Sequence, residues 1–395
     1  MKKHLLIITL ISLIALTLFS CKEPTRDFRV EFDLKGIVSD QASITVFGLR
    51  DSVQLNLYDP AKPFIPVIDG KIIVSGTTLQ DVVLRISLSQ DRQFYKYVDR
   101  GYFPNKASSL WCILGPGTNL KGSADLGGKN FVDFYPTGDK ENRLFSEFTS
   151  KYMPIQSRIG DIAVQMAIDT SLTETERNKL INESDSLEIQ SDRLRRELIE
   201  NNPSSIAALW LMEDMLVRSQ IEPADLEPLL AKVDPKYYEN YFYISVSDRV
   251  EGARLAAVGA PCPIIEGIDV HGNPFNLQEL LGKYVIIDFW GTWCSACLSG
   301  MPAMREFQKA NADKLTLIGI ANDKEIEKVI SCMEKHQMEW TNLLQMQGNT
   351  DYVAKFNVQG FPTKILIDPN GAIVYRDSGE SEEFYLEVDK IINTK

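Results

Sequence analysis

The sequence predicts an α/β fold with a mixed central sheet at the C-terminus, preceded by a mostly-β, sandwich-like domain and a helical middle segment. Three observations predict this division. Short β-branched and aromatic runs fill residues 28–137, apolar residues at helical spacing fill residues 138–257, and strand and helix signals alternate through residues 258–395. A chain of 395 residues is also too long for one ordinary core, so two or three domains are expected.

The N-terminal region, residues 28–137, predicts a small antiparallel sandwich. Its short candidate strands are separated by turn signals such as Asp69-Gly70. The clearest candidate strands are residues 44–47, 71–74 and 82–86. No catalytic motif is visible in this region, and Cys112 is interpreted as a core residue because free cysteine is among the most buried residue types.

The middle region, residues 138–257, predicts a helical spacer. Apolar residues from Leu144 to Met166 recur at alternating steps of four and three residues, which marks one face of a helix that Pro154 should kink. A charge-rich second helix follows, either as a solvated face or as a partner-binding surface. Pro203 suits the first turn of a third helix.

The C-terminal region, residues 258–395, follows a boundary at Pro261-Cys262-Pro263, which cannot lie inside a helix. The predicted strands are residues 284–290, 315–320, 364–368 and 372–376, and the predicted helices are residues 302–309, 324–337 and 381–392. The first strand is apolar enough to be a buried central strand, and the last two flank a hairpin turn. This alternation predicts an α/β domain.

The first residues predict export from the cytoplasm. Residues 1–20 read as a signal peptide, with a basic start and an uncharged apolar run too short to span a bilayer comfortably. The run ends at Ser20-Cys21, which resembles a bacterial lipobox, so lipidation of Cys21 and a tether over residues 21–27 are expected. We therefore expect a lipid-anchored protein of the bacterial cell envelope that faces the periplasm. An ordinary signal peptide or a retained anchor helix is the alternative.

The net charge and the spacing of the cysteines limit the classes of function that this chain can have. The net charge of −12 argues against a nucleic-acid partner, because phosphate contacts need Lys and Arg. Of six cysteines, only Cys294 and Cys297 form a close pair. Outside the cytoplasm thiols tend to oxidise, so such a pair is either handled by redox partners or is a stable disulfide.

The pair lies where the predicted buried strand gives way to a helix. Free N–H groups and the partial positive charge of a helix N-terminus would stabilise a thiolate at Cys294, and the thiolate is the nucleophilic form. Cys297 lies one helical turn later, so its sulfur can attack a mixed disulfide on Cys294. The pattern therefore predicts thiol–disulfide exchange.

Two other readings of the pair are weaker. A zinc site needs two further ligands, but the chain has only three histidines and no second Cys-x-x-Cys, so no metal is expected. A purely structural disulfide closing so small a loop would add little stability.

The stretch from Asp288 to Cys297, DFWGTWCSAC, resembles the active-site stretch of thioredoxins, and most closely the TlpA/ResA branch of membrane-associated disulfide reductases. Gly360-Phe361-Pro362-Thr363 resembles the second signature of that family. The resemblance covers residues 259–395 and implies an α/β thioredoxin fold there. The preceding regions more loosely resemble the uncharacterised β-domain and helical spacer of Bacteroidetes-type lipoproteins.

The resemblance also implies roles for individual residues. Asp288 would relay a proton to Cys297, and burial should raise the pKa of this carboxyl, unless it is a solvent-facing or edge residue. A cis Pro362, together with Thr363, would hold the substrate backbone. Trp293 and Phe361 would shield the sulfurs and contact the substrate, or they are simply packing aromatics.

One position departs from the TlpA/ResA pattern. The branch often carries a glutamate three residues after the second cysteine, and this chain has Gly300 there. The resemblance therefore does not extend to any role of that glutamate in partner or substrate selection.

Together these features predict an extracytoplasmic thiol–disulfide oxidoreductase that works as a reductant on envelope proteins. It would need no cofactor, because a membrane or periplasmic dithiol protein would supply electrons. One alternative is a peroxiredoxin-like thiol peroxidase, although the Pro-x-x-x-Thr/Ser-x-x-Cys context of those enzymes is not found near Cys294. Another is an envelope binding module with a secondary redox domain.

Overall fold

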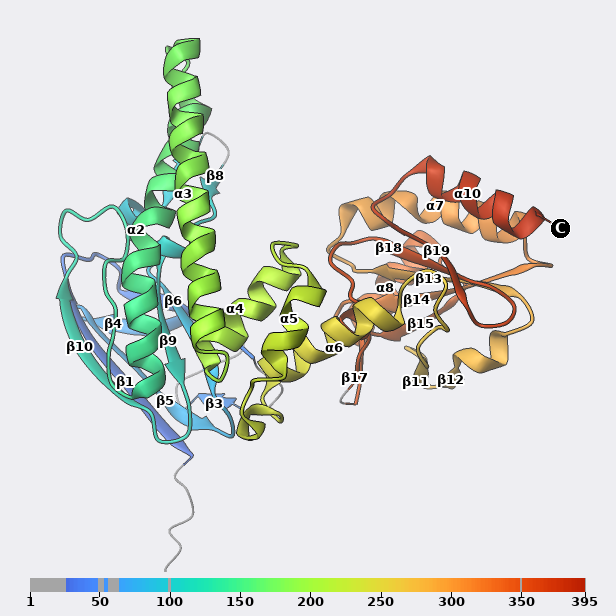
Figure 1. Ribbon diagram of the computed structural model, residues 1–395, viewed down its shortest axis with the longest axis horizontal. Coiled ribbons are helices and arrows are strands. Elements are labelled where there is room, and N and C mark those ends of the chain that lie inside the picture. The colour runs from blue at the N-terminus through green and yellow to red at the C-terminus, as the bar shows by residue number, and fades with distance from the viewer. Residues whose placement is uncertain (1–25, 49–52, 56–63, 99–100, 349, 395) are drawn as a thin grey trace, which may run out of the picture. The chain divides into compact units, whose positions relative to one another are not determined.

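A computed structural model describes residues 26–48, 53–55, 64–98, 101–348 and 350–394 of the chain (Figure 1). The predicted signal peptide, Cys21 and all but the last residues of the tether lie outside this description. Within the described part of the chain, no helix combines the length and the apolarity that crossing a bilayer requires.

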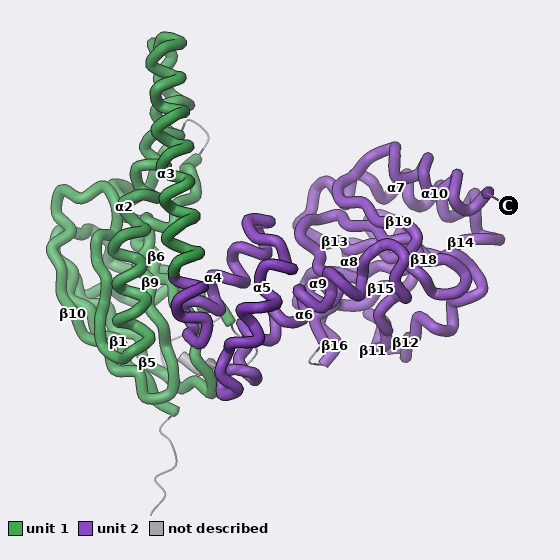
Figure 2. Tube along the Cα trace, viewed as in Figure 1, with its two compact units in different colours: residues 1–197 green, residues 198–395 purple. Residues whose placement is uncertain are grey.

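The chain divides into two compact units, Met1–Glu197 and Leu198–Lys395 (Figure 2). This division differs from the three predicted segments, because the first unit holds two long helices of the middle region and the second unit holds the rest. The boundaries predicted after residues 137 and 257 stay predictions.

The first unit is built on an eight-stranded sheet with the strand order β10-β1-β5-β4-β2-β6-β9, in which β3 pairs with β5. Its strands are β1 (Asp27–Lys35), β2 (Gln41–Phe47), β3 (Val53–Leu55), β4 (Phe64–Ile68), β5 (Lys71–Thr78), β6 (Val82–Ser87), β9 (Ser109–Leu114) and β10 (Asn119–Asp125); β7 (Lys96–Val98) and β8 (Gly101–Phe103) form a separate ribbon. The mostly-β prediction is confirmed. The predicted antiparallel pairing holds for the other described strand pairs of this sheet but is wrong for β1 and β10, which run parallel.

The sheet of the first unit encloses one apolar core. Inward residues alternate along β1, where Val30 and Phe32 are fully buried. Cys112 on β9 joins the same core, as expected for a small apolar side chain. β9 is buried on both faces because a helix covers its outer side, where the backbone N–H and carbonyl of Ile113 bond the amide of Asn142 at 2.9 Å each.

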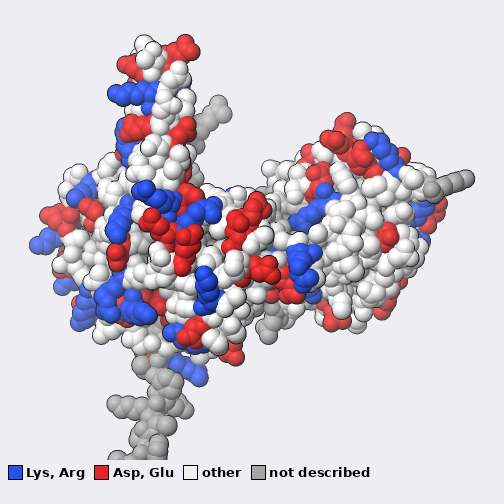
Figure 3. Space-filling model, in the orientation of Figure 1, with Lys and Arg blue, Asp and Glu red and all other residues white. Residues whose placement is uncertain are grey.

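Two long helices, α2 (Lys140–Ile168) and α3 (Glu174–Asn201), form a hairpin in which α2 continues as one element through Pro154. Arg158 on α2 donates two hydrogen bonds, of 2.7 and 2.9 Å, to Glu183 on α3. Side chains of both charges are interspersed along the hairpin (Figure 3), which fits the predicted solvated face.

The second unit begins with three helices, α4 (Ile206–Val217), α5 (Pro223–Leu230) and α6 (Tyr241–Leu255). The sequence placed the start of α4 around Pro203, but the helix begins at Ile206. The hydroxyl of Ser205 accepts the N–H of Ala208, so a serine cap rather than the proline sets the boundary.

A five-stranded mixed sheet follows, with the order β15-β14-β13-β18-β19. Its strands are β13 (Tyr284–Trp290), β14 (Leu315–Ala321), β15 (Thr341–Leu344), β18 (Thr363–Ile367) and β19 (Ile373–Ser378). β13, β14 and β15 are parallel, whereas β18 is antiparallel to both of its neighbours. The predicted α/β fold of residues 258–395 is confirmed.

Helices and short elements complete this unit. They are α7 (Ser295–Ala310), α8 (Ile326–His336), α9 (Tyr352–Lys355) and α10 (Glu382–Asn393), with the ribbons β11 (Glu266–Ile268) and β12 (Pro274–Asn276), and β16 (Met346–Gln347) and β17 (Thr350–Asp351). Side chains of α7, α8 and α10 form one core with one face of the sheet, and α9 packs on the opposite face.

Side chains of the central strand β13 point alternately to the two faces of the sheet, and one of these faces packs against α7. Ile286 and Trp290 belong to the core that contains both cysteines of the pair, whereas Ile287 and Phe289 belong to the opposite core. Because side chains alternate along a strand, Asp288 lies on the same face as Ile286 and Trp290.

Candidate active site

The site is built where β13 ends and α7 begins. A turn closed by the N–H of Cys294 on the carbonyl of Gly291, at 3.0 Å, makes Cys294 the N-cap residue of α7. Its sulfur accepts the N–H of Cys297 at 3.1 Å. This N–H is one of the donors that a helix start leaves unpaired, so the sulfur takes the place of the oxygen of a usual capping side chain.

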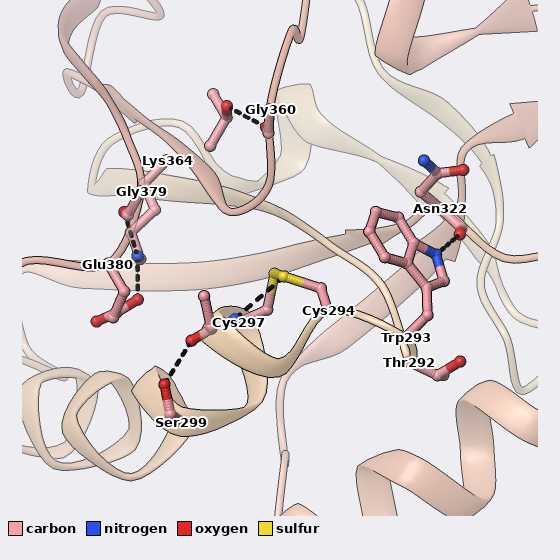
Figure 4. Close-up of a disulfide and its surroundings, with 12 residues drawn as sticks. Thr292, Trp293, Cys294, Cys297, Ser299, Asn322, Gly360, Lys364, Gly379 and Glu380 are labelled. Atoms are coloured by element: carbon pink, nitrogen blue, oxygen red, sulfur yellow. Dashed lines mark hydrogen bonds and ion pairs between the residues drawn. A yellow bond between two sulfur atoms is a disulfide. The ribbon is translucent and has the colours of Figure 1, made fainter. Parts of the chain in front are cut away.

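Cys294 and Cys297 are joined in a disulfide across the first turn of α7 (Figure 4). Both sulfur residues are nearly enclosed, with exposed fractions of 6% for Cys294 and 2% for Cys297. Cys297, Gly300 and Met301 share the buried face of α7. The described chain is therefore the oxidised form of the pair.

An exposed aromatic lies beside the disulfide. The side chain of Trp293 is 58% exposed, and its indole N–H donates to the carbonyl of Asn322 at 2.9 Å (Figure 4). Its ring meets the ring of Phe361 edge-on, with the centroids 5.3 Å apart. The structure thus brings together the two aromatics that the sequence singled out.

Asp323 fixes the turn before the cysteines, and sequence reasoning missed it. Its carboxylate accepts the backbone N–H and the hydroxyl of Thr292, each at 2.8 Å. Its position just beyond the end of β14 was the available signal, because the carboxyl ends of the parallel strands β13 and β14 meet at one edge of the sheet.

The second signature forms a loop with a cis Phe361–Pro362 bond, as the family resemblance implies. Pro362 and Thr363 are buried. The hydroxyl of Thr363 donates to the carbonyl of Gly360 at 2.8 Å and shares a hydrogen bond with Ser378 at 3.0 Å. The side chain of Thr363 therefore supports the loop, and a contact between this loop and substrate stays a prediction.

Two arginines hold the carbonyl groups that precede this loop. Arg249 on α6 is buried and donates to the carbonyl of Val358 at 3.1 Å. Arg376 on β19 donates to the carbonyls of Phe356 at 2.7 Å and Asn357 at 2.8 Å. Helix α6, which precedes the α/β sheet, thus helps to position the proline loop, a role that its prediction as part of a spacer did not include.

Asp288 is a buried acid on the central strand. Its side chain is 1% exposed, and its Oδ1 has no hydrogen-bond partner within the described residues. The solvent-facing alternative is therefore excluded. Burial raises the pKa of Asp288 to about 7, against the lowering effect of Lys364 and with a further rise from Glu380.

A buried ion pair lies beside this acid. Lys364 stands opposite Asp288 in the β13–β18 register and is 2% exposed. Its ammonium lies 2.5 Å from a carboxylate oxygen of Glu380 (Figure 4), and the other oxygen accepts the hydroxyl of Tyr385 at 3.0 Å. A Cβ added to Gly300 would overlap this carboxylate.

Sequence reasoning missed Lys364 and Glu380. Lys364 looked like the first residue of a strand, and Glu380 lies in the turn before α10. The glycine at position 300 was the one signal available, since it marks a place where another group approaches the helix closely.

Among the described residues, the three cysteines outside the pair are buried or partly buried and are not activated as thiolates. Burial raises the pKa of Cys262 to about 12 and also raises the pKa values of Cys112 and Cys332. Within the described ranges, no group of His, Cys, Asp or Glu side chains is arranged to hold a metal ion.

Comparison with known proteins identifies similar chains. Residues 258–376 match the AhpC/TSA family. The thioredoxin-like protein YneN of Bacillus subtilis is 34% identical over 106 residues, which cover 26% of this chain and 60% of YneN. The thiol-disulfide oxidoreductase ResA of Bacillus cereus is 28% identical over 131 residues, which cover 33% of this chain and 75% of that ResA. This chain thus spans less than two thirds of YneN but more of ResA.

One solved structure with sequence similarity to this chain is also known. The crystal structure of the thioredoxin domain of a thiol-disulfide oxidoreductase from Bacteroides vulgatus has 32% sequence identity, covers 35% of this chain and 99% of that chain, and has a TM-score of 0.33.

Proposed function

We propose that the C-terminal domain of this chain, which is similar to the thioredoxin-like, ResA-type thiol–disulfide oxidoreductases, exchanges disulfides with envelope proteins through Cys294 and Cys297. The observation that carries the proposal is the position of the pair. One sulfur caps the start of α7, and the other lies one helical turn inward. A thiolate at the cap position would be stabilised by the same N–H group and by the helix dipole.

The proposed reaction starts from the reduced pair. The thiolate of Cys294 attacks one sulfur of a substrate disulfide, forms a mixed disulfide and releases the other substrate sulfur as a thiolate. The sulfur of Cys297 then loses its proton and attacks the sulfur of Cys294. The mixed disulfide breaks, the Cys294–Cys297 disulfide forms, and the second substrate sulfur leaves as a thiolate that takes up a proton. Two electrons pass from the enzyme dithiol to the substrate disulfide.

We propose that Asp288 is the base that accepts the proton of Cys297. The acid lies on the strand face that packs under α7, and its pKa of about 7 lets it accept and return a proton near neutral pH. Water has little access there, because Asp288 and Cys297 are 1% and 2% exposed. A carboxyl already inside the domain is therefore the available base.

Substrate would approach over the exposed aromatic side of the pair. The 58% exposed ring of Trp293, packed against Phe361, offers an apolar surface to an unfolded or extended chain. The loop of Pro362 and Thr363 would then bind the substrate backbone.

The start of the sequence supports the compartment, and the resemblance of the active-site stretch to disulfide reductases supports the reducing direction. The signal-like start and Cys21 support a lipid-anchored protein that faces the periplasm. In that oxidising compartment, a reductant needs a dithiol protein of the membrane or periplasm to reduce its disulfide again. We propose this reducing direction.

Trapping the mixed disulfide tests the function. A full-length Cys297→Ser chain, incubated with an oxidised disulfide protein such as insulin, should accumulate a covalent adduct on Cys294 that dithiothreitol releases. The matched control is Cys262→Ser, which removes a cysteine of the same domain and should form no lasting adduct. If the Cys297→Ser chain forms no adduct although Cys294 reacts with small alkylating reagents, the proposed function is wrong.

A further inference from the structure

Three ionisable side chains lie close together on the α7 face of the sheet. Asp288 and Lys364 are cross-strand neighbours, and Glu380, in the turn before α10, forms an ion pair with Lys364. Asp288 and Lys364 are 1% and 2% exposed, and the side chain of Glu380 is 21% exposed. The cluster thus holds one ammonium and two carboxyl groups in a place largely closed to water.

The ammonium of Lys364 forms an ion pair with Glu380. The two groups lie 2.5 Å apart, whereas Oδ1 of Asp288 has no hydrogen-bond partner in the described part of the chain. With both carboxyls ionised the cluster would carry a net negative charge, and with Asp288 protonated it is neutral. Burying an uncompensated charge is costly, so the proton belongs on Asp288.

Gly300 makes this arrangement possible. It lies on the buried face of α7, one turn beyond Cys297, and a Cβ there would overlap the carboxylate of Glu380. Glu380 therefore fills the space that a side chain at position 300 would occupy. Figure 4 shows Lys364 and Glu380 on the side of α7 that carries Cys297.

We propose that Glu380 is a positioning residue for thiol exchange: by pairing with Lys364 in the space left by Gly300, it withholds the ammonium from Asp288. In this way Glu380 sets the pH at which Asp288 takes the proton of Cys297. The inference rests on the proposed role of Asp288 as the base for Cys297. Glu380 touches neither substrate nor sulfur and acts through Lys364.

The other groups around Asp288 fit this role. On β14 the residue opposite Asp288 is Gly319, which carries no charge. From α10, the hydroxyl of Tyr385 donates to Glu380, and the pKa of Tyr385 is raised by burial and by Glu380. Lys364 and Glu380 are thus the charged groups whose balance acts on Asp288, and Glu380 adds to the rise of its pKa.

Three full-length variants test the inference. Glu380→Gln frees the ammonium of Lys364 to pair with Asp288, and Gly300→Ala pushes the Glu380 carboxylate away without changing any charge. Both should move the pH midpoint of the resolving step down by about one unit or more, since an opposite charge at short range lowers the pKa of a carboxyl by that order. Lys364→Gln removes the cation and should move the midpoint up.

The resolving step can be followed directly. In excess 5,5′-dithiobis(2-nitrobenzoate), the thiolate of Cys294 forms a mixed disulfide with one thionitrobenzoate and releases the other as a thiolate. When Cys297 attacks Cys294, the Cys294–Cys297 disulfide forms and the bound thionitrobenzoate is released in a second step. The rate of that second release at 412 nm, measured from pH 5 to 9 in a Cys262→Ser, Cys332→Ser background, gives the midpoint. Glu380→Asp keeps the carboxylate, so its pH midpoint should lie closer to that of the unsubstituted chain than the midpoint of Glu380→Gln does.

The outcomes separate this inference from the proposed function. If the unsubstituted chain shows no second release at any pH, the proposed function fails. If it shows a pH profile that Glu380→Gln and Gly300→Ala leave unchanged, the positioning role of Glu380 is wrong and the function stands. Shifts in the same direction for Glu380→Gln and Lys364→Gln would mean that the pair is only structural and would overturn the inference.

Discussion

Replacing Asp288 with asparagine should stabilise the second unit at high pH while slowing its chemistry. Asparagine has nearly the same shape as a protonated aspartate, but it cannot ionise. The pKa of Asp288 is raised from 3.8 to about 7, so the folded unit holds this proton more tightly than the unfolded chain does. For an acid shifted in this direction, stability is lost as the pH rises from the unfolded value to the folded one.

The magnitude follows from the size of the shift. About three pH units at 1.36 kcal/mol each give a cost of about 4 kcal/mol, which is absent below about pH 4 and complete above about pH 7. Asp288→Asn should therefore match the parent chain near pH 4 and exceed its stability by up to about 4 kcal/mol at pH 8. The same change should slow the resolving step on the order of a hundredfold or more, because the base is gone.

Hydrogen exchange of the full-length protein measures this change in stability at one strand of the second unit. The amides of residues 284–290 on β13 report the opening of this sheet alone, and comparison with the parent at each pH cancels the intrinsic exchange rate. Slower exchange in Asp288→Asn at pH 8 and equal exchange at pH 4 is the expected pattern. Equal protection at both values, or a constant difference, would refute the reasoning.

Three further substitutions test the site and its support. Trp293→Ala should slow the reduction of protein disulfides about tenfold, because the ring is a contact surface for a protein substrate. The rate of reduction of a small disulfide, measured in parallel, should not change. Arg249→Met should leave the carbonyl of Val358 unpaired and weaken protection of its loop by about 1–3 kcal/mol in hydrogen exchange. Asn142→Ala should unpair both backbone groups of Ile113 and destabilise the first unit by roughly 2–4 kcal/mol in urea unfolding followed by exchange of β9. Unchanged protection in either case would contradict the packing described.

Much of the second unit could be predicted from local sequence. The apolar run of β13, the prolines before the sheet and the hairpin turn before β19 act over a few residues, so their signals survive without tertiary context. The strand-to-helix position of Cys294 was predicted in the same way. Burial of Asp288 followed from one acid in an otherwise apolar central strand.

The remaining features depend on contacts between distant segments. The parallel pairing of β1 with β10 joins the first and the last strand of this sheet along the chain, and no local pattern encodes it. The ion pair between Lys364 and Glu380 forms only in the folded sheet, which places both residues under α7, so the local sequence does not predict it. The start of α4 was missed for a local reason, because the capping hydroxyl of Ser205 outweighed the proline before it.

The reactivity of Cys294 is the most direct test of the account. Reduced full-length protein would be alkylated with iodoacetamide from pH 5 to 9, and each cysteine would be quantified by mass spectrometry. We predict that Cys294 reacts first and that its rate has levelled off by pH 7, whereas the rate at Cys262 still climbs because burial raises its pKa to about 12. A rate at Cys294 that rises tenfold per pH unit through pH 8, in parallel with Cys262, would show a protonated sulfur at neutral pH and contradict the proposed mechanism.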